Sequence, residues 1–218
     1  VQLQPLAETI ITGELNCNGY PVDGTIIIDN GPDIAADVIE VVNGSFGFSH
    51  YEGEHKLTVI AEGYVHRVMD LTFPAGVFDL NISLDPAIDV FVEDFEDDLS
   101  AWNAVGDWAL VENSTTGLLS VTDSPDVFYE NGTTAVLTIQ QPLNLNGVAD
   151  DAVLELWHKY HTEHDYDFCR LEYSTNGTSW TTLKSWDGYS EGWVHDIIPV
   201  AELANTFSYL RFVLEVDD

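Results

Sequence analysis

Histidine and acidic side chains alternate over one short stretch in which metal or acid–base chemistry is conceivable: His158, His161, Glu163, His164, Asp165 and Asp167. Histidines with carboxylates can ligate zinc, and paired carboxylates can act as general acid and base. A helix would align histidines three residues apart, but residues 154–157 have the pattern of a strand that runs into a loop. Neither an HExxH sequence nor a Cys/His quartet occurs. We therefore expect surface or turn histidines, with a zinc site as the alternative.

Aromatic residues gather in the stretch 185–193 (SWDGYSEGW), where they could stack on sugar rings. The candidates for ligand stacking are Trp186, Tyr189 and Trp193. Packing in the core or at a sheet edge is the competing interpretation, since aromatic side chains usually bury most of their area. No G-x-S-x-G nucleophile elbow is present, and the glycine-rich residues 44–47 lack the lysine of a phosphate loop. We expect a protein that is not an enzyme.

The composition is very acidic. The 218 residues include 38 aspartates and glutamates but only 6 lysines and arginines, a formal net charge of −32. Phosphate contacts need lysine and arginine, so nucleic acid is excluded as an ordinary partner, and anionic membranes are disfavoured. Hydrophobic residues make up 45% of the chain, which is enough apolar surface for a folded protein. No apolar run approaches the roughly 18 residues of a membrane-spanning helix.

Three features bear on the compartment. The sequence begins at Val1 without a leader, which indicates a processed or excerpted chain. Two free thiols are expected at Cys17 and Cys169, with one bridge as the alternative. N-x-S/T sequons mark five glycan-attachment candidates: Asn43, Asn81, Asn113, Asn131 and Asn176. Although Asn-Gly pairs also favour turns, the sequons point to an extracellular or cell-surface protein.

Helical periodicity is nearly absent, and the one helix-like piece spans residues 200–205. Alternation of period two, bounded by glycine, asparagine, aspartate and proline, predicts strands instead. The expected strands are 9–15, 25–29, 37–42, 56–61, 65–71, 77–84, 135–139, 153–160, 168–174 and 209–216. Turn signals between them recur about every 8–12 residues, which predicts an all-β protein built from antiparallel sandwiches.

A domain boundary is expected near residue 86, at an Asp-Pro pair. Before it there are 13 acidic and 2 basic residues and no tryptophan; after it there are 25 acidic and 4 basic residues and all 6 tryptophans. This shift in core chemistry indicates two β-sandwich domains in series. We expect an N-terminal tail at 1–8, a first sandwich at 9–86 and a second at 87–218.

Three motifs of the first segment are 19–25 (GYPVDGT), 43–48 (NGSFGF) and 57–64 (LTVIAEGY). They resemble the carboxypeptidase regulatory-like, or transthyretin-like, sandwich family. The resemblance implies a fold and is silent on catalysis. Some relatives carry a Lys–Asn isopeptide bond that needs a lysine on an early strand, whereas the only lysine here is the late Lys56, so no such bond is expected. The segment is expected to be a spacer or stalk.

The second segment carries the motifs 93–96 (EDFE), 123–125 (DSP), 154–167 and 171–177. They resemble the jelly-roll modules that accompany immune inhibitor A-type secreted peptidases, which are distantly similar to MAM domains. The resemblance makes Glu163, Tyr166 and Asp167 part of the fold signature. It also implies a structural calcium where the opening acidic strand meets nearby loops, since calcium prefers several oxygen ligands. The candidates carried over are Asp94, Glu96, Asp123 and Asp217, and the alternative is acids that only solvate the surface.

Members of that family continue past the equivalent of residues 211–218 with a closing strand, so the jelly roll is expected to lack its last strand. Such a gap leaves unpaired backbone groups at a sheet edge. Either the chain is a stretch of a longer protein, or a neighbouring subunit donates the strand. The alternating N-terminal tail supplies the donor-strand candidates Val1, Leu3 and Leu6.

Two functions follow from these expectations. The first is a non-catalytic extracellular structural protein, a filament, layer or adhesive stalk subunit that forms a homo-oligomer or polymer through its sheet edges. The alternative is a glycan- or calcium-binding accessory module of a secreted peptidase or another surface enzyme. An acidic, soluble surface fits both.

Overall fold

The computed structural model describes residues 6–31, 34–125, 128–150 and 152–217. Regular structure in these residues is β-strand, apart from the short 3-10 turn η1 (Ala201–Leu203). The chain divides into two compact units, Val1–Ile88 and Asp89–Asp218. None of the described residues forms a helix with the length and hydropathy needed to cross a bilayer. The protein is therefore all-β, as the alternation pattern predicts.

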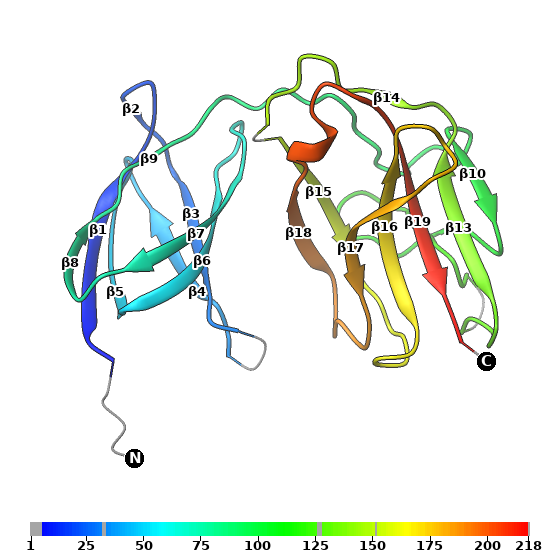
Figure 1. The fold of residues 1–218 in the computed structure, drawn as a ribbon, viewed down its shortest axis with the longest axis horizontal. Helices are drawn as coiled ribbons and strands as arrows, with labels where there is room; N and C mark the ends of the chain where they lie inside the picture. Colours follow the sequence, from blue (N-terminus) through cyan, green and yellow to red (C-terminus); the bar gives the residue numbers. More distant parts are fainter. Residues whose placement is uncertain (1–5, 32–33, 126–127, 151, 218) are drawn as a thin grey trace. The chain divides into compact units, whose positions relative to one another are not determined.

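The first unit is a sandwich of two sheets (Figure 1). One sheet is built around β1 (Glu8–Cys17), which pairs antiparallel with β2 (Tyr20–Pro21) and β5 (Ser45–Tyr51) and parallel with β8 (Gly76–Asp79) and β9 (Ile82–Ser83). The other is antiparallel in the order β4 (Asp37–Val41), β3 (Gly24–Asp29), β6 (Gly53–Ile60), β7 (Arg67–Phe73).

Aliphatic side chains fill the space between these two sheets. Ile11 on β1, Ile26 on β3 and Leu57 on β6 are completely buried in one cluster. Each belongs to an alternating strand, so its neighbours in sequence point the other way. Gly13 is required by close packing, because any side chain there would collide with the backbone carbonyl of Leu80.

The larger sheet of the second unit has the order β10, β13, β19, β16, β17, with β14 also on β19 (Figure 1). Its strands are β10 (Trp102–Val105), β13 (Thr134–Ile139), β14 (Leu143–Asn144), β16 (Phe168–Ser174), β17 (Thr181–Trp186) and β19 (Phe207–Glu215). The last strand, β19, lies inside the sheet between β13 and β16, with antiparallel pairing on both sides. The inner face of this sheet supplies Leu137 and Leu171, both completely buried.

Two separate strand pairs complete the second unit: β11 (Ala109–Val111) with β12 (Ser120–Thr122), and β15 (Val153–His158) with β18 (Val194–Pro199). We call the β15–β18 pair the ribbon. Leu154, Leu156 and Ile198 of the ribbon pack into the same core as Leu137 and Leu171, so the ribbon forms a second layer over the larger sheet. The unit is therefore a two-layer sandwich.

All ten predicted strand segments overlap strands of the structure, although the predicted segment 77–84 is two short strands, β8 and β9. The helix-like piece at 200–205 contains only η1. The pattern missed several strands, among them β5, β17 and β18. Both cysteines are free thiols, as expected, Cys17 in the first unit and Cys169 in the second.

Candidate functional site

The ribbon has two chemically different faces. Successive side chains of a strand point to opposite sides. On β15, Leu154 and Leu156 point into the core, so Glu155 and Trp157 point away from it. Across the strand pair, Glu155 lies opposite Ile197 and Trp157 lies opposite His195. The side that carries Glu155, Trp157 and His195 is called the outer face below.

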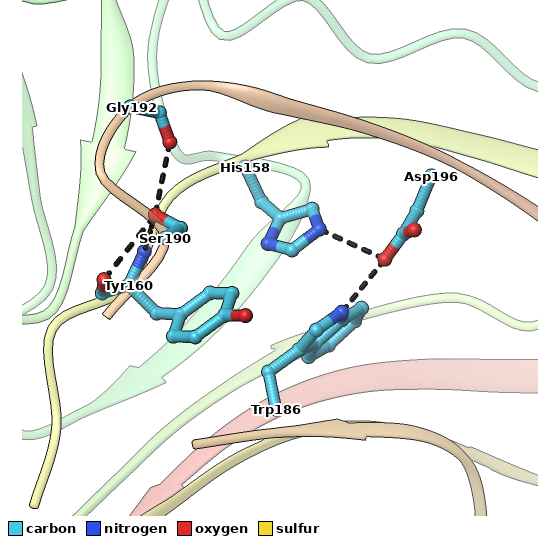
Figure 2. Close-up of polar contacts among 6 residues, drawn as sticks. All are labelled: His158, Tyr160, Trp186, Ser190, Gly192 and Asp196. Carbon is cyan, nitrogen blue, oxygen red and sulfur yellow. Dashed lines mark hydrogen bonds and ion pairs between the residues drawn. The ribbon is translucent and has the colours of Figure 1, made fainter. Parts of the chain in front are cut away.

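Beneath the outer face, a polar network holds the ribbon to the larger sheet (Figure 2). His158 Nε2 lies 2.9 Å from Asp196 Oδ2, and the Trp186 indole N–H donates to the same oxygen at 2.7 Å. The hydrogen bond from His158 lowers the pKa of Asp196, the bond from Trp186 adds to this, and burial opposes it. The inward carboxylate is thereby kept ionised and tied to both layers.

The turn that leads into β18 is fixed next to this network (Figure 2). The Ser190 backbone N–H donates to the Tyr160 carbonyl at 3.1 Å, and the Tyr160 N–H donates back to the Ser190 hydroxyl at 3.1 Å. The same hydroxyl contacts the Gly192 carbonyl at 2.9 Å. Because these bonds join the end of β15 to the start of β18, the ribbon is rigid at this end.

Trp157 is the central residue of the outer face. Among the tryptophans, all of which lie in the described part of the chain, it is the one with a large exposed fraction, 47%. Its ring stacks on the imidazole of His195, with centroids 4.6 Å apart and planes 7° from parallel. His195 Nε2 in turn lies 3.2 Å from Glu155 Oε2. The result is a flat aromatic surface with a carboxylate beside it.

A second tryptophan lies just beyond one end of the ribbon. Trp193 comes two residues before His195, and Lys159 comes two residues after Trp157, so both lie just beyond the end of the β15–β18 pairing. The Lys159 ammonium group lies 5.1 Å from the centroid of the Trp193 ring, a cation–π contact. The pair of Lys159 and Trp193 therefore lies next to the end of the ribbon, on the side of Trp157 that is away from Glu155.

The three residues predicted to stack on sugars lie in three different environments. Trp186 is 9% exposed and donates to Asp196, so it is a core residue and offers no ring face to a ligand. Trp193 lies at the edge of the outer face. Tyr189 is 64% exposed and lies in a separate loop group with His161, at a centroid distance of 4.8 Å.

That loop group borders a shallow hollow of about 300 Å³, which is lined by Phe128, Tyr129, His161, Thr162 and Glu163. The Tyr129 hydroxyl donates to Asp167, which is 3% exposed. Asp167 thus has structural hydrogen bonds, to the Tyr129 hydroxyl and the Asp217 backbone N–H.

Sequence reasoning missed Trp157 as a surface residue. The tryptophan belongs to the resembled motif, which drew attention to its role in the fold. A usable signal was present, however. Leu154 and Leu156 alternate with Glu155 and Trp157, and this pattern alone places Trp157 on the polar side of the strand.

The carboxylates of two calcium candidates, Asp94 and Glu96, accept hydrogen bonds from backbone N–H groups. Glu96 Oε1 accepts hydrogen bonds from the N–H groups of Leu118 and Leu119, at 2.8 and 2.9 Å. Asp94 Oδ1 accepts one from the Glu96 N–H at 3.1 Å. The Glu96 carboxylate holds the loop residues Leu118 and Leu119 against the start of the second unit, and Asp94 fixes the backbone at Glu96.

The other pair lies near Asp167. The Asp217 backbone N–H donates to Asp167 Oδ1 at 3.0 Å, while Asp123 Oδ2 accepts from the Ser124 hydroxyl at 2.7 Å. Burial, with the charges of Asp123 and Asp167 in addition, raises the pKa of Cys169 to about 12. Calcium at the four candidates stays a prediction.

The three histidines spaced by three residues do not converge. His158 points inward to Asp196, whereas His161 and His164 are exposed in the following loop. In the described part of the chain, one group brings three possible metal-binding atoms within 4.8 Å of one another, namely His164, Asp165 and Asp187. Asp187 there accepts a hydrogen bond from the Asp165 N–H, which lowers the pKa of its carboxyl, and His164 adds to the effect.

The remaining predicted sites are on the surface or outside the described residues. All five sequon asparagines are exposed: Asn43, Asn81, Asn113, Asn131 and Asn176. Of the donor-strand candidates, Leu6 is 61% exposed, and Val1 and Leu3 lie outside the described residues. Glycan attachment and strand donation stay predictions.

Comparison with known proteins adds little at the level of sequence. No family model matches the chain, and no curated protein matches it. The two family resemblances drawn from the motifs therefore stay predictions.

Three solved structures resemble the chain over most of its length. They are a candidate carbohydrate-binding protein from Bacteroides uniformis (10% identity, 89% of this chain and 80% of that one, TM-score 0.32), a DUF3823 family protein from Parabacteroides merdae (10%, 98% and 100%, 0.32), and carbohydrate-binding modules of the β-sandwich superfamily with promiscuous specificity (11%, 99% and 94%, 0.37). Similarity at this level carries no information on the ligand or on individual residues.

Proposed function

We propose that the second unit is a non-catalytic, extracellular carbohydrate-binding module and that the outer face of the ribbon is its binding surface. The observation that carries this proposal is the placement of Trp157. Its large ring is 47% exposed on a strand whose two leucines pack into the core, and it lies flat against His195. Exposed aromatic surface of this kind marks interaction sites more often than chance.

The chemistry of the face suits a sugar. A pyranose ring has an apolar face of C–H groups and an edge of hydroxyls. The indole ring of Trp157 supplies a flat apolar partner for the first, and the Glu155 carboxylate and the His195 imidazole supply an acceptor and a donor for the second. A site of this type needs no deep pocket, so the open outer face can provide it.

The arrangement also favours a chain over a single sugar. Side chains two positions apart on one strand face are separated by about 7 Å. Trp193 lies just before β18, the strand that pairs with β15, and it precedes His195, the register partner of Trp157, by two residues. Two aromatic contacts along one line would engage two neighbouring residues of a polysaccharide, and their weak affinities would then reinforce one another.

The test is calorimetric titration of the whole chain with a panel of soluble polysaccharides, followed by the same titration of Trp157→Ala. We expect the substitution to weaken binding by about 10- to 100-fold, the usual effect of removing a central aromatic contact. Its melting temperature should stay close to that of the unchanged protein, because the ring is outside the core.

Two matched variants locate the site. Trp180→Ala removes another tryptophan from the same unit, one covered by Arg211 at 4.1 Å, and should leave binding intact. Tyr189→Ala removes the exposed ring of the loop group. Binding that survives Trp157→Ala but disappears with Tyr189→Ala would place the site in that loop group and contradict the proposal.

A further inference from the structure

The charges of the second unit restrict which glycans its outer face can accept. This unit has 25 acidic and 4 basic residues. In the described part of the chain both arginines of this unit are ion-paired, Arg170 with Glu215 and Arg211 with Glu172, and Lys159 lies over the Trp193 ring. No arginine is therefore available there for the bidentate contacts that carboxylated or sulfated sugars normally receive.

Negative charge also predominates on the outer face itself. Glu155 is exposed next to His195 and Trp157, where a bound sugar would lie. Lys159 lies next to the end of this face, with its ammonium group over the Trp193 ring. A carboxylate or sulfate on the sugar would meet Glu155 at short range and the negative field of the whole unit at long range.

From these charges we infer that the ligand is an uncharged glycan, a chain of neutral pyranose rings with one flat C–H face, and that anionic glycans are rejected. The inference rests on the proposed function and names the substrate class for the same site. A neutral hydroxyl donates to Glu155 at no electrostatic cost, whereas an anionic group within about 10 Å of the face is repelled at 0.1 M salt. The face thus selects neutral over anionic glycans by electrostatic repulsion of the anionic ones as well as by favourable contacts with the neutral ones.

The experiment compares one polymer in two charge states. Mixed-linkage β-glucan, xyloglucan, galactomannan and dextran are titrated first, together with alginate, polygalacturonate and heparin. The neutral polymer that binds best, dextran excepted because its backbone C6 oxygens are in glycosidic bonds, is then oxidised at its free C6 hydroxyls to carboxylates, which changes the charge and keeps the backbone. At 20 mM NaCl we expect the oxidised polymer to bind at least about tenfold more weakly, and at 0.5 M NaCl the difference should shrink to about threefold or less.

Glu155→Gln sharpens the comparison, because it removes one negative charge from the face and keeps the shape. This substitution should reduce the difference in binding affinity between the neutral and the oxidised polymer at low salt. Equal or tighter binding of the oxidised polymer at low salt would overturn the inference. Binding confined to the acidic polymers and lost in Trp157→Ala would overturn it while leaving the proposed function standing. Absence of binding to all seven polymers would overturn both.

Discussion

The two units solve the same packing problem with different residues. The first unit fills its sandwich with aliphatic side chains such as Ile26 and Leu57 and contains no tryptophan. The second adds tryptophans to its core, among them Trp102 and Trp186, which are 6% and 9% exposed. It also places Trp157 on the outer face. The comparison teaches that tryptophan serves two purposes in the second unit, since it fills the core at some positions and is exposed on a strand face at Trp157.

A related contrast concerns histidine. In the first unit, His50 and His55 pack around Phe73, and the His50 side chain is only 12% exposed. In the second unit, His195 forms part of an open surface with Trp157. A histidine ring packs against a buried phenylalanine in one unit and is part of an open surface in the other, because the strand register decides which side of the sheet the ring faces.

The largest expected effect separates the two cores. Leu57→Ala and Leu171→Ala each remove a completely buried leucine, one from each unit. Each should destabilise its own unit by about 2–5 kcal/mol, the usual cost of such a cavity. Differential scanning calorimetry should show one transition moving down and the other staying in place. If both transitions shifted together with either variant, the units would not be energetically separate.

An intermediate effect is expected for the polar network of the ribbon. Asp196→Asn removes the charge that binds His158 and Trp186, and it should cost the second unit about 1–3 kcal/mol in urea unfolding at pH 7. Glycan binding would weaken with it, because the ribbon carries the outer face. Asp167→Asn is the matched control, a buried carboxylate of the same unit whose hydrogen-bond partners Tyr129 and Asp217 are outside the ribbon.

The pH dependence follows from the sign of the shift. The pKa of Asp196 is lowered in the folded protein from its ordinary value of 3.8. Its contribution to stability is therefore complete above pH 3.8 and is lost as the pH falls through the folded pKa. Between pH 5 and pH 2, the second unit of Asp196→Asn should lose less stability than that of the unchanged protein. An identical acid slope in both proteins would show that Asp196 is not held ionised by its neighbours.

The smallest effect tests the acidic surface. Raising NaCl from 20 to 300 mM in the presence of a chelator should stabilise the second unit by up to about 1 kcal/mol, and the first unit by less, because salt screens the repulsion between carboxylates. The two calorimetric transitions report this directly. Adding calcium at constant ionic strength then tests the predicted calcium site. A larger gain for the first unit than for the second would contradict the charge comparison.

Much of the fold was predictable from local patterns. Strands such as β3, β6 and β16 have β-branched or aromatic residues at alternate positions, and this is a strong signal. β18 was missed because its sequence, VHDIIP, has a polar pair inside an apolar run and no clean alternation. Its strand pairing comes from β15, which lies about 40 residues earlier in the chain, and no local pattern records it.

The sequence by itself determined the all-β class, the change from an aliphatic to a tryptophan-containing segment, and the net charge of −32. These are properties of composition and of period-two alternation, which depend only on neighbouring residues. Only the tertiary structure decided that Trp186 is buried against Asp196, while Trp157 meets His195 on the opposite face. Whether a ring is core or surface depends on which distant strand pairs with its own, and that choice is made by packing of the whole unit.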